Sequence, residues 1–230
     1  MAIWLTLCGI TLVSAYLLGS IPTGYTVGKL LKGIDIREFG SGSTGATNVL
    51  RTLGKGPGAF VLTIDCLKGV LAIFFVYWLF HFAQSQNLIP AAVDATIWQP
   101  WMITLAGLAA ILGHSKSIFL GFTGGKSVAT SLGVLLAMNW LLALLTAAVF
   151  AIVVASSRIV SLSSIAGAIA VPMLMILLHQ PLAYILFGIA GGLYVIWRHT
   201  SNIKRLITAT EPKLGHNPQP AEPKQTSSFP

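Results

Sequence analysis

The sequence predicts an all-α integral membrane protein with seven transmembrane helices, an N-terminus outside the cell and a C-terminus in the cytoplasm. Of the 230 residues, 55% are hydrophobic and only 9% are charged, whereas about a quarter of the residues of a soluble domain are charged. Long apolar segments alternate with short polar blocks, which is typical of a chain that crosses a bilayer several times. The lysines and arginines fall in blocks that would lie on one side of the membrane, and this bias marks that side as cytoplasmic.

The expected spans follow from the apolar segments in chain order. They cover residues 3–19, 59–82, 98–113, 129–138, 140–155, 162–178 and 182–197. The first is a retained span rather than a cleaved signal peptide, because no lysine or arginine precedes Lys29 and a signal peptide begins with a basic region. We expect a kink at residues 20–24 followed by a helix to Lys32, and loops over 33–58 and 84–99.

The apolar stretch 127–157 decides the number of crossings. Its 31 residues would form a helix of about 46 Å, which is too long for one span of about 30 Å and short for two. A turn at Asn139 gives a short hairpin and puts all 14 lysines and arginines on, or at the membrane edge of, one side. A single span would export Arg158 and the basic cluster after residue 197. The positive-inside rule therefore favours seven spans.

One span carries a charged pair. Asp65 and Lys68 are three residues apart in the span 59–82, so they share one face of the helix. A charge inside a membrane helix is costly, so we expect this pair to face the bundle and to pin helices together. A direct catalytic role for Asp65 is the alternative.

Composition excludes several kinds of site. Cys8 and Cys66 lie in apolar surroundings and are expected to be small core residues rather than zinc ligands or a disulfide. No three residues have metal-ligand spacing, so we expect no metal. The net charge of +8 belongs to membrane topology and not to nucleic-acid binding.

Residues 209–230 are rich in proline, lysine, glutamine and serine and should form a disordered cytoplasmic tail after a membrane domain of residues 1–208.

The central polar block, residues 40–51, reads GSGSTGATNVLR. Its glycines free the backbone N–H groups to turn toward one point, its serines and threonines add hydroxyls, and Arg51 adds a guanidinium fork. This is the composition of an anion cradle, and a helix that begins directly after it would suit a phosphate. The alternative is a Gly/Ser linker between two helices.

A second polar block, residues 113–127, reads GHSKSIFLGFTGGKS. It resembles a nucleotide P-loop, but GxxxxGK[ST] would place the first glycine at Leu120, whereas the glycine is Gly121. Gly-Gly-Lys-Ser at a helix start still presents N–H groups, a hydroxyl and the Lys126 ammonium to an anion. His114 is open to two interpretations, a helix-end structural residue or a substrate contact.

Four polar segments converge on the cytoplasmic face under this topology: residues 40–51, residues 114–126, a turn at 161–164 and residues 198–202. Basic donors and hydroxyls dominate them, and carboxylates are too few for a two-carboxylate mechanism. Such a site fits a phosphorylated polar substrate that meets a lipidic one. The rival interpretations are a transporter of a phosphorylated metabolite, which would carry polar residues near the midplane in matched halves, and a lipid-binding scaffold without catalysis.

The motifs GSGSTGATNVLRTLGKGPG, GHSKSIFLGFTGGKSVATSLG, VSLSSI and WRHTSNIKRL resemble, in order and spacing over residues 1–206, those of the bacterial acyl-phosphate:glycerol-3-phosphate acyltransferases. The resemblance implies a seven-span enzyme of the bacterial plasma (inner) membrane with its active site on the cytoplasmic face. It implies transfer of a fatty acyl group from acyl phosphate to the primary hydroxyl of glycerol-3-phosphate, giving lysophosphatidic acid and inorganic phosphate, the first acylation of phospholipid biosynthesis. It also implies no cofactor, and functional coupling to the enzyme that makes acyl phosphate.

The resemblance also implies a set of site residues. The substrate- and phosphate-binding positions are Ser41, Gly42, Asn48, Arg51, Gly125, Lys126, Ser161, His199 and Asn202. No residue is expected to act as a nucleophile, because phosphate is a good leaving group and the glycerol hydroxyl can attack directly. Its proton would go to the donor phosphate or to His199. Ser43 stands where the family usually has asparagine, and a serine keeps a donor and an acceptor but has a shorter reach.

Overall fold

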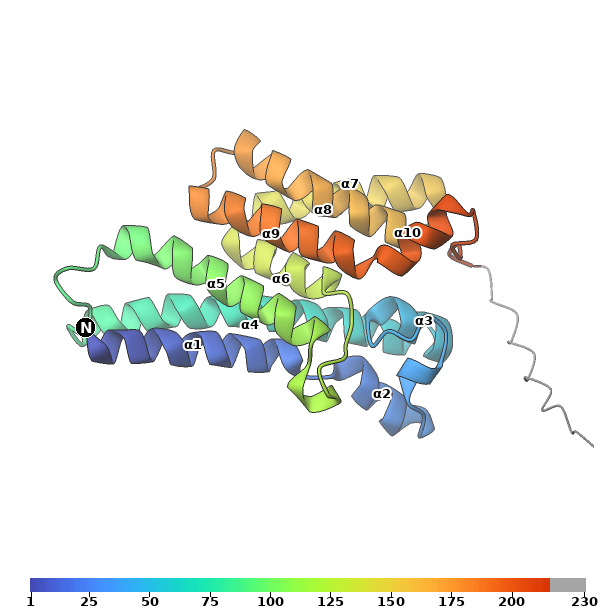
Figure 1. Cartoon of the computed structure of the whole chain (residues 1–230), viewed down its shortest axis with the longest axis horizontal. Coiled ribbons are helices and arrows are strands. Elements are labelled where there is room, and N and C mark those ends of the chain that lie inside the picture. Colours follow the sequence, from blue (N-terminus) through green and yellow to red (C-terminus); the bar gives the residue numbers. More distant parts are fainter. Residues whose placement is uncertain (216–230) are drawn as a thin grey trace, which may run out of the picture.

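The computed structural model describes residues 1–215, and every regular element in that part of the chain is a helix. The long helices run side by side along one axis (Figure 1). They are α1 (Ala2–Ser20), α4 (Lys55–Ser85), α5 (Ala95–Ser115), α6 (Val128–Met138), α7 (Trp140–Ser157), α8 (Val160–Leu177) and α9 (Leu182–Arg198). The short helices α2 (Thr23–Lys32), α3 (Ala46–Leu53) and α10 (Thr200–Ile207) gather at the end of the bundle opposite the N-terminus (Figure 1). Two 3₁₀ turns, η1 (Ile36–Glu38) and η2 (Ile118–Leu120), lie in the connections.

Several helices are long and apolar enough to cross a membrane. Within residues 1–215 five segments meet this criterion, namely α1 joined to α2, α4, α5, α7 and α8. A sixth is the pair α9 and α10, which bends by 61° at their junction, and α6 is apolar but has only 11 residues. The predicted all-α class with several apolar spans is confirmed, while the count of seven crossings and their direction remain predictions.

The predicted break at Asn139 is confirmed. Helix α6 ends at Met138, α7 begins at Trp140, and Asn139 between them is extended, with φ −161° and ψ 110°. The Asn139 side-chain oxygen accepts a hydrogen bond from the Leu142 N–H at 3.1 Å. The asparagine therefore caps α7 at its N-terminus, which explains why the apolar run turns at this residue.

Three segments expected to lack helix are wholly or partly helical, so these predictions were wrong. The segment 84–99 includes the end of α4 and the start of α5. The segment 33–58 contains η1 and α3, and α4 begins at Lys55. Gly54, with φ +98°, separates α3 from α4 in a conformation that favours glycine. The expected turn at 161–164 forms the start of α8, where the Ser163 and Ser164 hydroxyls donate to carbonyls four residues back, so the helix retains these polar side chains without unpaired hydroxyls.

Glycines allow the closest helix contacts. A methyl group at Gly69 of α4 would overlap the Thr130 carbonyl oxygen of α6, and one at Gly133 of α6 would overlap the Cys66 carbonyl oxygen of α4. A methyl group at Gly19 of α1 would likewise overlap the Ala110 carbonyl oxygen of α5. In a bilayer the hydrophobic effect does not drive helices together, and small residues let their backbones approach closely enough to pack. The half of the bundle built from α1, α4, α5 and α6 is therefore tightly packed.

The Asp65–Lys68 pair pins helices together, as the sequence predicted. The Lys68 Nζ lies 2.6 Å from Asp65 Oδ1, and both side chains are almost fully buried. The same ammonium donates to the Ile21 carbonyl at 2.5 Å. Ile21 lies at the break between α1 and α2, ahead of Pro22, so Lys68 satisfies a backbone acceptor that the break leaves outside the helix.

We predict that Asp65→Ala destabilises the protein by about 3–5 kcal/mol, because it leaves the Lys68 ammonium buried without its counter-ion. The double variant Asp65→Leu/Lys68→Met should lose less, since it removes both charges. Thermal unfolding of the purified proteins in detergent measures both. Equal or greater loss in the double variant would contradict the assignment of Asp65 as the counter-ion.

Candidate functional site

A cavity of about 650 Å³ lies between the helices at the end of the bundle that carries α3 and α10. Its polar part is lined by side chains of α3, of the loop before α6, of the start of α8 and of the α9–α10 junction. Its deeper part is lined by apolar and small residues of α6, α7, α8 and α9. One continuous space therefore joins a hydrophilic site to an apolar groove.

Asn48 organises the loop before α3. Its Oδ1 accepts from the Ser41 N–H at 2.8 Å, and its Nδ2 lies within 3.0 Å of the Ile36, Phe39 and Ser43 carbonyls. The side chain is 1% exposed. Because its amide is committed to this loop, Asn48 shapes the cradle that the sequence predicted instead of presenting its side chain to a ligand.

Ser43 supports the same loop. Its Oγ accepts from the Gly45 N–H at 3.3 Å, just before α3 begins at Ala46. The short serine side chain thus forms a local turn bond. Together with Ser41 it contributes a hydroxyl to the lining of the cavity.

The loop that carries Lys126 is held from several directions. The Gly125 N–H donates to the His114 carbonyl at 3.2 Å, and the Arg198 Nη2 donates to the Gly125 carbonyl at 3.0 Å. The Ser127 hydroxyl donates to the Ile111 carbonyl at 2.8 Å. A methyl group at Gly125 would overlap the His114 imidazole. These contacts fix the backbone and leave the Lys126 side chain at the wall of the cavity.

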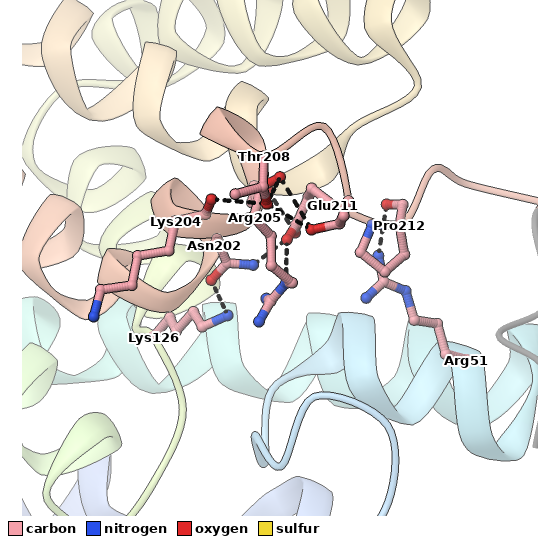
Figure 2. A network of polar contacts seen from close by, with 10 residues as sticks. Arg51, Lys126, Asn202, Lys204, Arg205, Thr208, Glu211 and Pro212 are labelled. Atoms are coloured by element: carbon pink, nitrogen blue, oxygen red, sulfur yellow. Dashed lines mark hydrogen bonds and ion pairs between the residues drawn. The ribbon is translucent and has the colours of Figure 1, made fainter. Parts of the chain in front are cut away.

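A hydrogen-bond network centred on Glu211 closes the polar end (Figure 2). Lys126 Nζ donates to Asn202 Oδ1 at 2.6 Å, and Asn202 Nδ2 donates to Glu211 Oε1 at 2.7 Å. Ser161 donates to the same carboxylate oxygen at 2.7 Å, and Arg205 Nε donates to the other oxygen at 2.7 Å. One carboxylate thus joins the Lys126 loop, the start of α8 and α10.

Arg51 reaches the same end of the cavity from α3. Its Nη2 donates to the Pro212 carbonyl at 3.3 Å (Figure 2). The guanidinium therefore lies beside the Glu211 segment and lines the cavity. Its fork is of the kind that binds phosphate oxygens in pairs.

His199, at the junction of α9 and α10, is 3% exposed. Its Nδ1 lies 2.7 Å from the Val195 carbonyl. Because a carbonyl only accepts, Nδ1 carries the proton and Nε2 bears the lone pair. Burial is the main cause that lowers the His199 pKa to about 4, so the ring is neutral near pH 7 and has one basic nitrogen.

Burial also lowers the pKa of Lys126, to about 8. The negative charge of Glu211 raises the Lys126 pKa, whereas the positive charges of Arg205, Arg51 and Arg198 lower it further. Burial alone would raise the Glu211 pKa, but the hydrogen bonds from Asn202, Ser161 and Arg205 outweigh it and hold the pKa below its ordinary value. The site is therefore rich in positive charge that a bound anion would compensate.

Most of the residues that the sequence singled out come together at this cavity. Those that line it are Ser41, Asn48, Arg51, Lys126, Ser161, His199 and Asn202. Gly42 and Gly125 are not among its lining residues. Gly42, with φ +69°, provides a turn, and Gly125 provides space for the His114 ring.

Sequence reasoning missed Glu211, interpreted Arg205 only as a topology determinant in the basic cluster after residue 197, and treated Arg198 only as part of that cluster and of a polar segment. Glu211 fell in the predicted tail, yet residues 209–215 are described, and Glu211 is only 7% exposed. Three side chains, Ser161, Asn202 and Arg205, donate hydrogen bonds to the buried carboxylate. The one available signal was an acid close in sequence to the cations Lys204 and Arg205. The rest of the predicted tail, 216–230, lies outside the described residues.

Comparisons with known proteins agree on one family. The family model described as glycerol-3-phosphate acyltransferase matches residues 9–209. A protein of Trichormus variabilis with the name glycerol-3-phosphate acyltransferase is 75% identical over 94% of this chain and 95% of its own length. One of Nostoc sp. with the same name is 74% identical over the same shares.

A solved structure is also similar. It is the glycerol 3-phosphate form of PlsY (YgiH), an integral membrane glycerol 3-phosphate acyltransferase, with a TM-score of 0.79 and 36% identity over 90% of this chain and 96% of that one. The lysophosphatidic acid form of the same protein gives a TM-score of 0.77. With the match of the family model across nearly the whole helical bundle, these findings show that the chain belongs to the glycerol-3-phosphate acyltransferase family of integral membrane proteins.

Proposed function

We propose that this protein transfers a fatty acyl group from acyl phosphate to the primary hydroxyl of glycerol-3-phosphate, giving lysophosphatidic acid and inorganic phosphate. The observation that carries the proposal is that the basic, hydroxyl-rich end of this cavity continues into an apolar groove. Such a space accommodates two phosphoryl groups beside an acyl chain. The relatives in the family carry the name of this activity.

The polar end supplies donors for both phosphoryl groups. In this proposal the loop before α3 and Lys126 stabilise the departing phosphate through hydroxyls and an ammonium that line this end of the cavity. Arg51, His199 and Asn202 orient glycerol-3-phosphate, and Ser161 adds a hydroxyl beside Asn202. The hydrogen bonds around Glu211 hold Asn202 and Ser161 in place.

The chemistry needs no enzyme nucleophile. Acyl phosphate is a mixed anhydride, so the glycerol hydroxyl oxygen can form a bond to the acyl carbon directly. The bond from that carbon to the phosphate oxygen breaks, and phosphate leaves with the electron pair. Positioning and charge stabilisation are the contributions required of the protein. The hydroxyl proton has two available acceptors, an oxygen of the donor phosphate and Nε2 of His199.

We also infer seven crossings, with the N-terminus outside and the site on the cytoplasmic face of a bacterial plasma membrane. The break at Asn139 supports α6 and α7 as a hairpin. The cations Arg51, Lys126, Arg198 and Arg205 all belong to the end of the bundle opposite the N-terminus (Figures 1 and 2). The positive-inside rule assigns that end to the cytoplasm.

Coupling to the enzyme that makes acyl phosphate stays a prediction.

The direct experiment gives the purified protein palmitoyl phosphate and glycerol-3-phosphate and measures phosphate and lysophosphatidic acid. We expect both products only when both substrates are present. A folded sample that releases no phosphate above the uncatalysed rate would overturn the proposal and favour a transporter or a scaffold.

Arg51→Lys should raise KM for glycerol-3-phosphate by about tenfold, since a point charge cannot replace a fork that makes paired hydrogen bonds. Arg37→Lys is the matched control, because Arg37 pairs with Asp35 at 2.7 Å and does not line the cavity. Steady-state kinetics with varied glycerol-3-phosphate measures both variants. If KM is unchanged in Arg51→Lys, Arg51 does not contact this substrate.

The value of kcat/KM should fall as the pH rises through about 8, because the Lys126 pKa of about 8 means that the ammonium loses its proton there. His199, with a pKa of about 4, stays neutral across this range and contributes no change. Lys126→Arg should move the alkaline fall to higher pH, since the guanidinium stays charged. An identical alkaline limb in this variant would remove Lys126 as its source, and the uncatalysed hydrolysis of acyl phosphate is measured as the blank.

A further inference from the structure

The apolar part of the cavity follows α9 away from the polar end. Small residues form much of its wall on α8 and α9, namely Gly167, Ala168, Gly188, Gly191 and Gly192. On α7 the Thr146 hydroxyl donates to the Leu142 carbonyl of its own helix at 2.8 Å, so this lining polar group is satisfied without a ligand. The groove therefore suits an unbranched hydrocarbon chain.

The groove has a definite end. Its deepest lining residue on α9 is Phe187, twelve residues before His199, which corresponds to about 18 Å at the helical rise. On α8 the deepest is Val171, ten residues after Ser161 and so about 15 Å away. Phe187 is 2% exposed and Val171 is 7% exposed. Two independent helices thus place the closed end at a similar depth.

The Phe187 ring is held in place by close contact with α5. A methyl group at Gly107 would lie 2.9 Å from Phe187 Cε2 and 2.9 Å from Val134 Cγ1, so the ring packs directly on the glycine backbone. Contacts this close leave the ring no room to move toward α5. Phe187 therefore forms a rigid wall.

Gly191 keeps the groove open above that wall. It lies one helical turn from Phe187, and the atoms nearest to a methyl group placed on it are Ile111 Cδ1 at 3.6 Å and Phe187 Cζ at 3.9 Å. A methyl group therefore fits in ordinary contact, while a longer side chain would project into the lined space.

We propose that Phe187 and Gly191 set the length of the acyl chain that the protein accepts, with Phe187 as the end wall and Gly191 as the opening. The inference rests on the proposed acyl transfer and adds to it a pair of specificity-determining residues. A chain that reaches Phe187 fills the groove, and each further methylene must displace the ring or leave the cavity.

The experiment measures kcat/KM for a series of saturated acyl phosphates from octanoyl to stearoyl, with glycerol-3-phosphate at saturation. Phe187→Leu should shift the preferred chain to longer donors, and Gly191→Leu should shift it to shorter ones. We expect kcat/KM for a given donor to change by about tenfold for each methylene that the groove gains or loses. Gly191→Ala gives a smaller shift in the same direction as Gly191→Leu and guards against misfolding. Leu193→Ala is the control, because Leu193 lies on the same helix but is 64% exposed and away from the groove.

Opposite shifts in the Phe187 and Gly191 variants would support the inference. Folded variants that all keep the wild-type length profile would overturn it while leaving the acyl transfer intact. A wild-type protein inactive with every donor would refute the proposed function itself.

Discussion

The site depends on the carboxylate of Glu211. Buried cations at the end of an apolar bundle need a counter-charge, and Glu211 supplies it through hydrogen bonds from Asn202, Ser161 and Arg205. Lys126 joins through Asn202. This one group therefore connects three segments that lie far apart along the chain, and it places the donors on one wall of the cavity.

The two halves of the bundle serve different purposes. Helices α1, α4, α5 and α6 meet across glycines so closely that added methyl groups would overlap backbone atoms, which makes a rigid platform. On the other side, a methyl group added at Gly167 or Gly191 would meet its nearest neighbour at an ordinary contact distance of 3.6 Å, whereas one at Gly192 would lie 2.7 Å from the Ala168 carbonyl oxygen. Glycine therefore gives close helix packing at some positions and space along the groove at Gly167 and Gly191, depending on what faces it. The rigid half carries Asp65 and Lys68, whose ion pair fixes the break after α1.

Much of the architecture follows from sequence alone, because hydropathy and charge are strong signals in a membrane chain. The apolar segments, the break at Asn139 and the buried pair of Asp65 and Lys68 were predictable for that reason. Helix α3 was not, since eight amphipathic residues inside a polar block lack an apolar run. Glu211 was missed because its role depends on Ser161, fifty residues earlier, which only the fold brings near. The sequence likewise could not show that Asn48 commits its amide to its own loop.

The central claim is that one cavity holds both phosphoryl groups at its basic end with the acyl chain beyond them. A structure of the protein with glycerol-3-phosphate and a non-hydrolysable acyl phosphonate tests this most directly. We predict both phosphorus atoms among Arg51, Lys126 and Asn202, with the hydrocarbon chain running along α9 toward Phe187. Phosphoryl groups bound at opposite ends of the bundle, or a chain lying outside the groove, would contradict it.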